Sequence, residues 1–209
     1  LDSDNKIYLS GYFGRDVFNV SNSFKNTYGN TVVNFRWNHL FSDKLFSNLS
    51  LIYSDYYYGL DLNFVGFKWN SGIQNMNVKF DLKQYLNDHF SLEYGLQNTY
   101  YGFNPGIIQP NRPTSGINSE ELTKKNAFEN AVYLDIKQQV SEKISLRYGA
   151  RLSSFLRLGQ DELNSYDDDN PLIFNPELQI YQAVDPIGII NRSSGSVEAS
   201  FINIEPRLS

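Results

Sequence analysis

Runs of about ten residues in which apolar and polar side chains alternate constrain the fold of this chain more than any other feature. Residues 45–54, 74–86 and 90–97 place apolar side chains at every second position, with Asn, Lys, Asp or Glu among the residues between them. Successive side chains of a β-strand point to opposite faces, so the alternation predicts strands with one apolar and one polar face. A strand that has lipid on one side and a wet lumen on the other has this composition.

The same alternation predicts eight strands along the chain and the start of a ninth. We place them at residues 6–16, 31–39, 45–54, 74–86, 90–97, 128–140, 144–156 and 195–203, with Arg207 opening the ninth. Tight turns are predicted near four residues: Asp43, Asn87, Glu142 and Glu205. Long connections are predicted to follow four others: Asp16, Asp55, Gly102 and Gly159. Turns at one end and long loops at the other are typical of transmembrane barrels, and all seven prolines fall in predicted loops or turns.

Composition is compatible with both a membrane barrel and a soluble β-protein. The 209 residues include 15 Tyr and 15 Phe, which suits the aromatic girdles of outer-membrane barrels but also a soluble β-sandwich or a carbohydrate-binding module. No apolar run reaches the length of a membrane-spanning helix. The net charge of −5 argues against a nucleic-acid partner, and the lack of cysteine excludes disulfides and thiolate chemistry.

No catalytic, metal or cofactor site is predicted. The two histidines, His39 and His89, lie beside predicted turns, and neither a phosphate-binding loop nor an HExxH helix occurs. Asp167, Asp168 and Asp169 could offer oxygen ligands to Ca²⁺, but the spacing and the closing glutamate of an EF-hand are absent. A solvated acidic loop is the simpler interpretation, and we expect no enzymatic activity.

Three consecutive tyrosines at the end of the third predicted strand are candidates for substrate binding. Tyr56, Tyr57 and Tyr58 could stack on a sugar or a hydrophobic ligand at the outer mouth of a barrel. They could equally form its outer aromatic girdle.

Three arginines form the second candidate group. Arg147, Arg151 and Arg157 share one face of the seventh predicted strand and could attract an anionic solute or contact an internal plug. The alternative is that inward-facing arginines pair with carboxylates on neighbouring strands, namely Glu93, Glu129 and Asp135.

Residues 30–59, NTVVNFRWNHLFSDKLFSNLSLIYSDYYYG, resemble the barrel of TonB-dependent receptors of Bacteroidota-type bacteria, as do residues 204–209, IEPRLS. The resemblance implies a 22-stranded outer-membrane barrel with an N-terminal plug that takes up a scarce nutrient with energy transmitted by TonB. Residues 1–209 would then be mid-barrel strands and outer loops of a single barrel domain, without the plug domain and the C-terminal strands. The motifs belong to the barrel wall and identify no ligand-binding residue.

The expected function is therefore active transport across the outer membrane of a Gram-negative bacterium. The partners that the resemblance implies are outer-membrane lipid and, through the plug, the TonB system, and it allows a surface lipoprotein over the barrel. Two alternatives are open: a self-contained small barrel acting as a passive pore or an adhesin, and a soluble β-protein that binds glycans.

Overall fold

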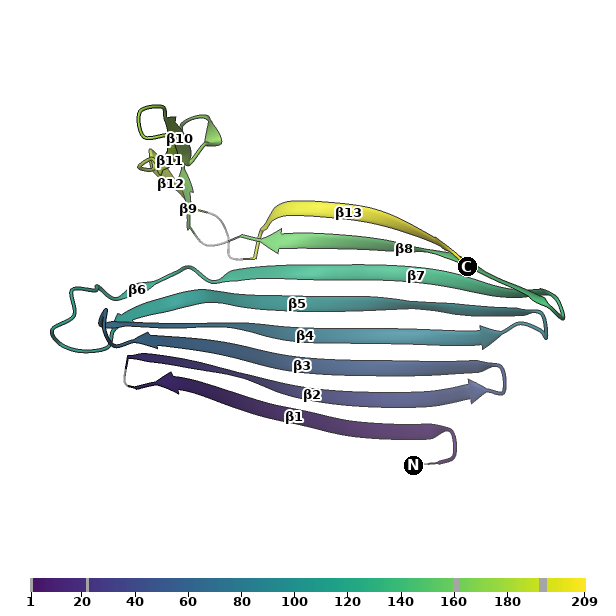
Figure 1. Ribbon diagram of the computed structural model, residues 1–209. Coiled ribbons are helices and arrows are strands. Elements are labelled where there is room, and N and C mark those ends of the chain that lie inside the picture. The colour runs from purple at the N-terminus through teal and green to yellow at the C-terminus, as the bar shows by residue number, and fades with distance from the viewer. Residues whose placement is uncertain (1, 22, 160–161, 192–194) are drawn as a thin grey trace.

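A computed structural model describes residues 2–21, 23–159, 162–191 and 195–209, most of them in antiparallel β-structure. Eight long strands lie side by side in one curved sheet (Figure 1). They are β1 (Asn5–Val20), β2 (Phe24–Ser42), β3 (Leu45–Leu62), β4 (Phe67–Tyr85), β5 (Phe90–Pro110), β7 (Lys125–Ser141), β8 (Ile144–Leu158) and β13 (Val197–Leu208). The short β6 (Glu120–Glu121) adds to the end of β5.

The structure confirms the predicted all-β, antiparallel fold and the count of eight to nine strands in one sheet. The strands follow one another in the order β1-β2-β3-β4-β5-β7-β8-β13. The sheet is open: within the described residues, β1 and β13 each pair along one side only.

Two of the four connections predicted to be long are tight turns. β1 extends to Val20 and β2 begins at Phe24, where the sequence pattern predicted a connection from residue 19 to residue 30. β3 extends to Leu62 and β4 begins at Phe67, where it predicted a loop reaching Gly72. Both predictions were wrong because the strands continue after their alternation has changed phase, as described below.

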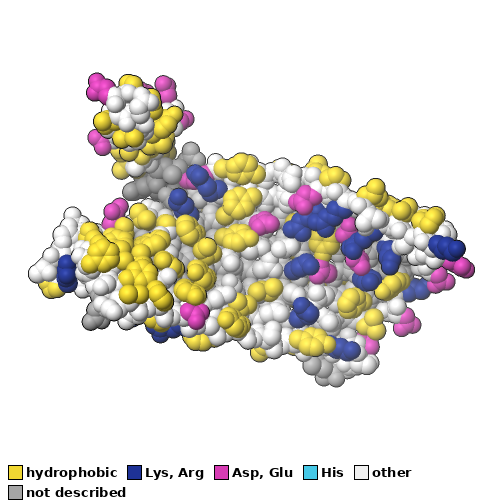
Figure 2. Space-filling model, in the orientation of Figure 1, with side chains coloured by type: hydrophobic (Ala, Val, Ile, Leu, Met, Phe, Trp, Pro, Cys, Tyr) yellow, Lys and Arg dark blue, Asp and Glu magenta, His cyan; other side chains and the backbone are white. Residues whose placement is uncertain are grey.

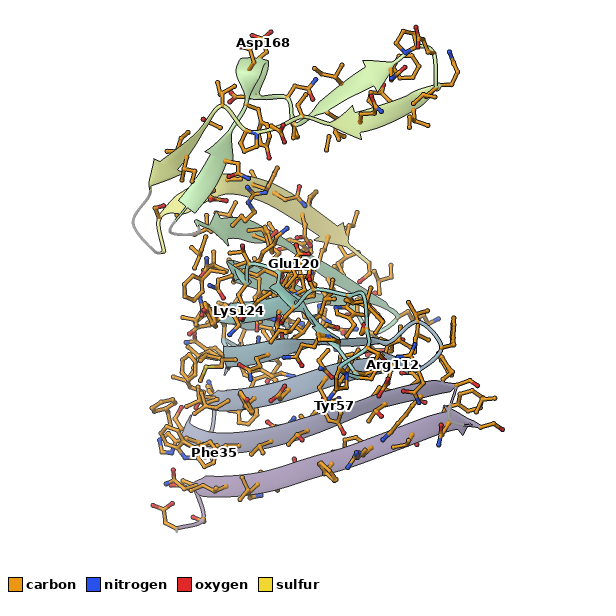
Figure 3. The ribbon with its side chains drawn as sticks, turned by 90° about the vertical axis from the view of Figure 1, so that its left-hand side faces the viewer. Phe35, Tyr57, Arg112, Glu120, Lys124 and Asp168 are labelled. Atoms are coloured by element: carbon orange, nitrogen blue, oxygen red, sulfur yellow. The ribbon has the colours of Figure 1, made fainter. Side chains whose placement is uncertain are left out.

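The other two connections are long, and both leave the same end of the sheet (Figure 1). Residues 111–124 join β5 to β7. Residues 159–196 join β8 to β13 and contain β9 (Glu162–Ser165), the 3₁₀ turn η1 (Asp167–Asp169), β10 (Leu172–Asn175), β11 (Ile180–Ala183) and β12 (Gly188–Asn191). These strands form two small two-stranded sheets, β10–β11 and β12–β9, and Figure 3 shows them, with Asp168, standing away from the large sheet. At the opposite end the strands are joined by connections of two, four and two residues, after β2, β4 and β7.

Three prolines lie within strands, contrary to the prediction that all seven fall in loops or turns: Pro105, Pro110 and Pro206. Pro105 lies in a bulge of β5, between the pairs Asn70–Ile107 and Gly72–Asn104. Pro110 is the last residue of the same strand. Pro206 lies in β13, an edge strand, where a missing backbone donor is tolerated.

The last strand also differs from its prediction. β13 continues through Glu205 and Arg207 to Leu208, paired with β8 along this whole stretch. The predicted turn near Glu205 and the ninth strand starting at Arg207 were therefore wrong. The proline at position 206 suggested a turn, but an edge strand accommodates it.

The register brings the alternation of all eight strands into phase and gives the sheet two distinct faces. One cross-strand row is apolar throughout: Ile7, Trp37, Leu49, Phe80, Leu96, Val132, Leu152 and Ile204. The adjacent row points to the other face: Lys6, Asn38, Asn48, Asp81, Gly95, Tyr133, Arg151 and Glu205. We call these the apolar face and the polar face. A slip of one residue in any strand would exchange them.

Large side chains on the apolar face are exposed over a band of limited height. On β7 this band runs from Ile136 to Phe128, five residues of one face, which span about 27 Å at roughly 3.4 Å per residue. Val132 and Leu134 in this band are 54% and 45% exposed. A hydrogen-bonded ladder of Asn98, Asn130 and Ser154 interrupts the band. An apolar surface of this extent requires cover by lipid or by protein.

Toward the long connections, the polarity of the two faces is exchanged. Positions that continue the polar face carry large apolar side chains, which we call the aromatic cluster: Tyr28, Tyr56, Tyr58, Leu60, Phe67, Trp69, Ile73 and Phe103. Positions that continue the apolar face carry polar residues, among them Thr27, Asp55, Asp61, Lys68 and Gln74. Figure 2 shows hydrophobic side chains gathered at this end of the sheet and charged ones toward the tight turns.

Candidate functional site

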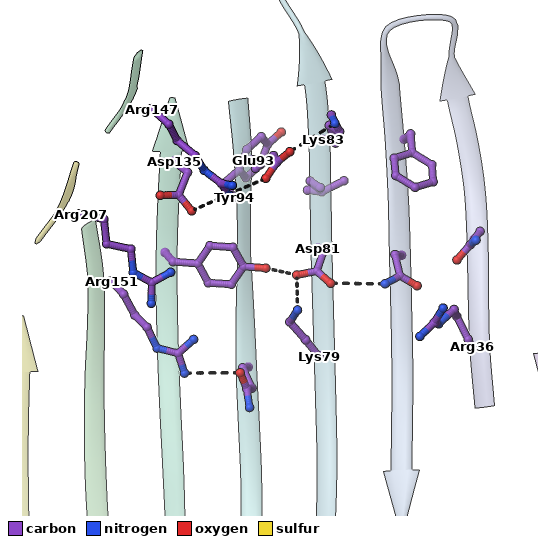
Figure 4. Close-up of a pocket in the computed structure, with 16 residues that line it drawn as sticks. Arg36, Lys79, Asp81, Lys83, Glu93, Tyr94, Asp135, Arg147, Arg151 and Arg207 are labelled. Atoms are coloured by element: carbon purple, nitrogen blue, oxygen red, sulfur yellow. Dashed lines mark hydrogen bonds and ion pairs between the residues drawn. The ribbon is translucent and has the colours of Figure 1, made fainter. Parts of the chain in front are cut away.

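The polar face contains a hollow near the tight turns, with a volume of about 530 Å³, in which charged side chains from six strands meet (Figure 4). We call it the cationic hollow. Six cationic and three anionic side chains line it: Arg36, Lys79, Lys83, Arg147, Arg151 and Arg207, with Asp81, Glu93 and Asp135. The positive excess is local, because the whole chain carries a net charge of −5.

Asp81 lies near the middle of the hollow, and its carboxylate contacts three side chains, one from each of β7, β4 and β3. The Tyr133 hydroxyl on β7 donates to Asp81 Oδ1 across the intervening strand β5. Lys79 Nζ lies 3.2 Å from the same oxygen, and Asn48 Nδ2 lies 3.3 Å from Oδ2. The tyrosine can cross β5 because Gly95 stands between the two residues in the row, and a Cβ there would come within 2.7 Å of the Tyr133 hydroxyl.

Arg147 connects the two other carboxylates of the hollow. Its Nη2 lies 2.8 Å from Glu93 Oε2 and 3.4 Å from Asp135 Oδ2. Lys83 Nζ lies 3.2 Å from the other oxygen of Glu93. Asp135 is buried, so a cationic partner compensates part of the cost of removing its charge from water. Of the two interpretations of the arginines, the structure thus shows the second for Arg147, which pairs with carboxylates on neighbouring strands.

Arg157 and Arg151 differ from this pattern. Arg157 lies toward the long connections and pairs with Glu198 at 2.8 Å, a residue that the sequence interpretation had not included. Arg151 lines the hollow and donates to Gln97 at 3.4 Å. The structure therefore brings Arg147 and Arg151 into one site and leaves Arg157 outside it.

The proposed pairing partner Glu129 is not used by an arginine in the described part of the chain. It accepts a hydrogen bond of 2.9 Å from the Tyr101 hydroxyl. Glu129 lies on the polar face of a strand next to β8, which made it a candidate partner for an arginine. The register of β5 and β7 instead places it near Tyr101.

The three consecutive tyrosines do not form one surface. Tyr56 and Tyr58 belong to the aromatic cluster, where the Tyr58 and Trp69 ring centroids are 5.6 Å apart. Tyr57 points to the opposite face, beside Gly29 and Gly72. Neighbouring residues of a strand necessarily face opposite ways, so a ligand on one face could contact Tyr56 and Tyr58 but not Tyr57.

Sequence reasoning missed several residues of the hollow, above all Asp81 and Tyr133. Each lies at a polar-face position of its own strand, and that signal was available. The information that places the two beside each other is the register of β4, β5 and β7, which the alternation alone does not define.

No protein-family model, no curated protein and no solved structure matches this sequence. Within the described residues, no helix is long and apolar enough to cross a membrane. The same part of the chain holds no group of three or more His, Cys, Asp or Glu side chains placed to bind a metal ion.

Replacing Arg147 with Gln should destabilise the fold modestly. Asp135 would lose its cationic partner while remaining buried, and because Arg147 itself is half exposed we expect a loss of about 1 kcal/mol in unfolding free energy. Denaturant unfolding of the purified protein measures this loss. The double variant Arg147→Gln/Asp135→Asn is the control, since it removes the buried charge together with its partner, and it should recover most of the loss. An additive loss in the double variant would contradict the pairing.

Proposed function

We propose that this chain is part of the wall of an outer-membrane transport barrel, a receptor that takes up a scarce nutrient with energy supplied through TonB. The observation that carries the proposal is the exposed apolar band, which follows the register across neighbouring strands and extends about 27 Å along the strand direction. Strands of outer-membrane barrels are tilted by roughly 35–45°, so this length corresponds to a band roughly 19–22 Å tall, close to the apolar band of about 25 Å in such barrels.

Strand length and the exchange of polarity support the same assignment. A membrane-spanning β-strand needs about 9–11 residues, whereas β1 to β5 contain 16 to 21 residues. The additional residues lie toward the long connections, where the outward positions become polar. This is expected of strands that continue beyond the bilayer into water.

The polar face supports a role in passage of a solute. Lys, Arg, Asp, Glu and Asn side chains line it, as in the lumen of a barrel. No side chain in the hollow requires bond-making chemistry to explain its position, because ion pairs and hydrogen bonds account for the placement of the three carboxylates.

The two open edges favour a barrel with further strands. Backbone N–H and C=O groups along β1 and β13 have to be paired inside a membrane, where no water can satisfy them. Additional strands on both edges, as in a 22-stranded receptor, would provide this.

A self-contained barrel is the second candidate, and the strand count favours it. Eight long strands suffice to close a small barrel if β13 pairs with β1. The predicted ninth strand, which an eight-stranded barrel would not accommodate, is not formed, because β13 continues through Glu205 to Leu208. Such a protein would be a passive pore or an adhesin.

Intact mass and fractionation of the native protein test the proposal. We expect the protein in outer-membrane fractions, extracted only by detergent, with a mass several times the 24.1 kDa of this chain. Loss of TonB should abolish uptake of its nutrient without changing its location. A detergent-requiring particle near 24.1 kDa would support the small barrel instead, and a protein soluble without detergent would contradict both membrane assignments.

A further inference from the structure

We propose that the cationic hollow binds a small polyanion, a solute that carries two or more phosphate or carboxylate groups. The inference rests on the proposed function in one respect, namely that the polar face lines the path of a solute. The argument itself depends on the charges and partners of the hollow.

Each carboxylate at the hollow already has a cationic partner. Asp81 pairs with Lys79 and Glu93 with Lys83, both at 3.2 Å, and Asp135 lies 3.4 Å from Arg147. At the edge of the hollow, Glu205 lies 3.7 Å from Arg207. Two cations of the lining are left over, Arg36 and Arg151, and in the described part of the chain neither pairs with a carboxylate.

The carboxylates have little capacity to neutralise these two arginines. Asp81 accepts from Tyr133, Lys79 and Asn48, and Glu93 accepts from Lys83 and Arg147. A guanidinium group offers five N–H donors in a planar fork that matches phosphate and carboxylate oxygens. Arg36 and Arg151 therefore have donors available to an incoming anion.

The spacing of the cations indicates a ligand with more than one anionic group. Arg36 lies on β2 and Arg151 on β8, five strand intervals apart, which is roughly 24 Å along the curved sheet. Figure 4 shows Lys79 between them and Arg207 beside Arg151. Cations spread over this distance can be bridged by several anionic groups but not by one.

The size of the hollow suits a small molecule. Its volume of about 530 Å³ lies within the usual range of ligand pockets, about 300–1,000 Å³. It does not offer the extended basic surface that a nucleic acid would require. A short polyphosphate or a polycarboxylate has the charge and the size that fit.

Calorimetric titration of the purified full-length protein in detergent with inorganic tripolyphosphate, in buffer without divalent cations, tests the site. We expect saturable binding that weakens as NaCl is raised, because salt screens the partly exposed arginines. The double variant Arg36→Gln/Arg151→Gln should lower the affinity by about tenfold or more, since it removes charge-assisted donors. Among the residues that the structure describes, neither arginine forms an ion pair with a carboxylate, so the variant should assemble normally.

Arg157→Gln is the matched control, because it removes a charge from the same face but outside the hollow, where Arg157 pairs with Glu198. It should leave tripolyphosphate affinity unchanged. If the wild-type protein did not bind tripolyphosphate, for example because an acidic protein segment already fills the hollow, the proposal would be overturned. An equal loss of affinity in Arg157→Gln would overturn it too. Fractionation reports separately on the transporter assignment: a membrane protein that does not bind tripolyphosphate would refute this site alone.

Discussion

Leu51→Arg should strongly impair assembly of the protein into the outer membrane to which the proposed function assigns it. Leu51 lies in the apolar band between Phe35 and Val78 of the neighbouring strands and is 40% exposed. An arginine on the lipid face of a barrel near the middle of the bilayer costs roughly 2–4 kcal/mol. Quantifying the folded protein in outer-membrane fractions, by its resistance to protease and to unfolding in cold detergent, measures the effect. Leu134→Arg, in the same band on β7, should behave alike.

Ser54→Arg is the control for Leu51→Arg, because Ser54 lies three residues further along the same strand and faces the polar side. Asn77 and Ser153, also polar-face residues, are poorer controls, since Asn77 donates to Thr99 at 2.7 Å and Ser153 to Glu205 at 2.9 Å. Arginine at residue 54 should leave assembly close to that of the wild type. Equal tolerance of arginine on both faces would show that the apolar face does not contact lipid.

Gly95→Ala should lower the unfolding free energy by roughly 1–3 kcal/mol, the range found when a methyl group is forced into a packed site. The added Cβ would approach the Tyr133 hydroxyl to 2.7 Å and would collide with the carbonyl oxygen of Phe80. Because the backbone oxygen cannot move independently, the local pairing of β4 with β5 has to shift. The contact between Tyr133 and Asp81 would shift with it. Denaturant unfolding of the purified protein is the measurement.

Gly102→Ala on the same strand separates this effect from the general effect of replacing a glycine. A Cβ at residue 102 would have its nearest neighbour at 3.8 Å, an ordinary contact. We expect its stability to equal or slightly exceed that of the wild type, because alanine has less conformational freedom in the unfolded chain. If both substitutions proved equally harmless, Gly95 would not be needed for the passage of Tyr133 across β5.

Alternation in the sequence was sufficient to predict the fold class and the central part of each strand. Leu49 and Leu51 on β3 share a face with Phe80 and Val78 on β4, as the period-2 pattern requires. The pattern also predicted the long connection after Gly159, although not the two small sheets within it. The tight turn near Asp43 was predicted correctly, since Asp43 and Lys44 are the two residues between β2 and β3.

Strand ends toward the long connections could not be found in this way, and the reason is physical. On β3 the apolar positions are odd-numbered up to Tyr53 and even-numbered from Tyr56 to Leu62, because the two faces of the sheet exchange their polarity there. A search for one continuous phase therefore ends near residue 54 and interprets the remainder as a loop. The shift of phase is itself a sequence signal, and it marks the place where a strand passes from one environment to another.

The candidate site could be predicted only in part, for a related reason. Alternation assigned Arg147, Arg151 and Arg157 to one face, which the register supports. Which carboxylate each arginine meets depends on the strand beside it, and Arg157 meets Glu198 only because β13 returns to β8 across a long connection. Contacts between residues so distant in sequence follow from register rather than from local pattern.

The long connection between β8 and β13, residues 159–196, leaves the large sheet at the end of β8. The chain then returns as β13, which pairs with β8. β8 and β13 are held together by pairs from Leu158–Val197 to Tyr148–Leu208, and none of these depends on the peptide bonds of residues 159–196. Cleavage in the β10–β11 hairpin would give two polypeptides that stay associated through the sheet. The hairpin is therefore a place where an epitope, a fluorophore or a whole inserted domain can be added without changing the register of the large sheet.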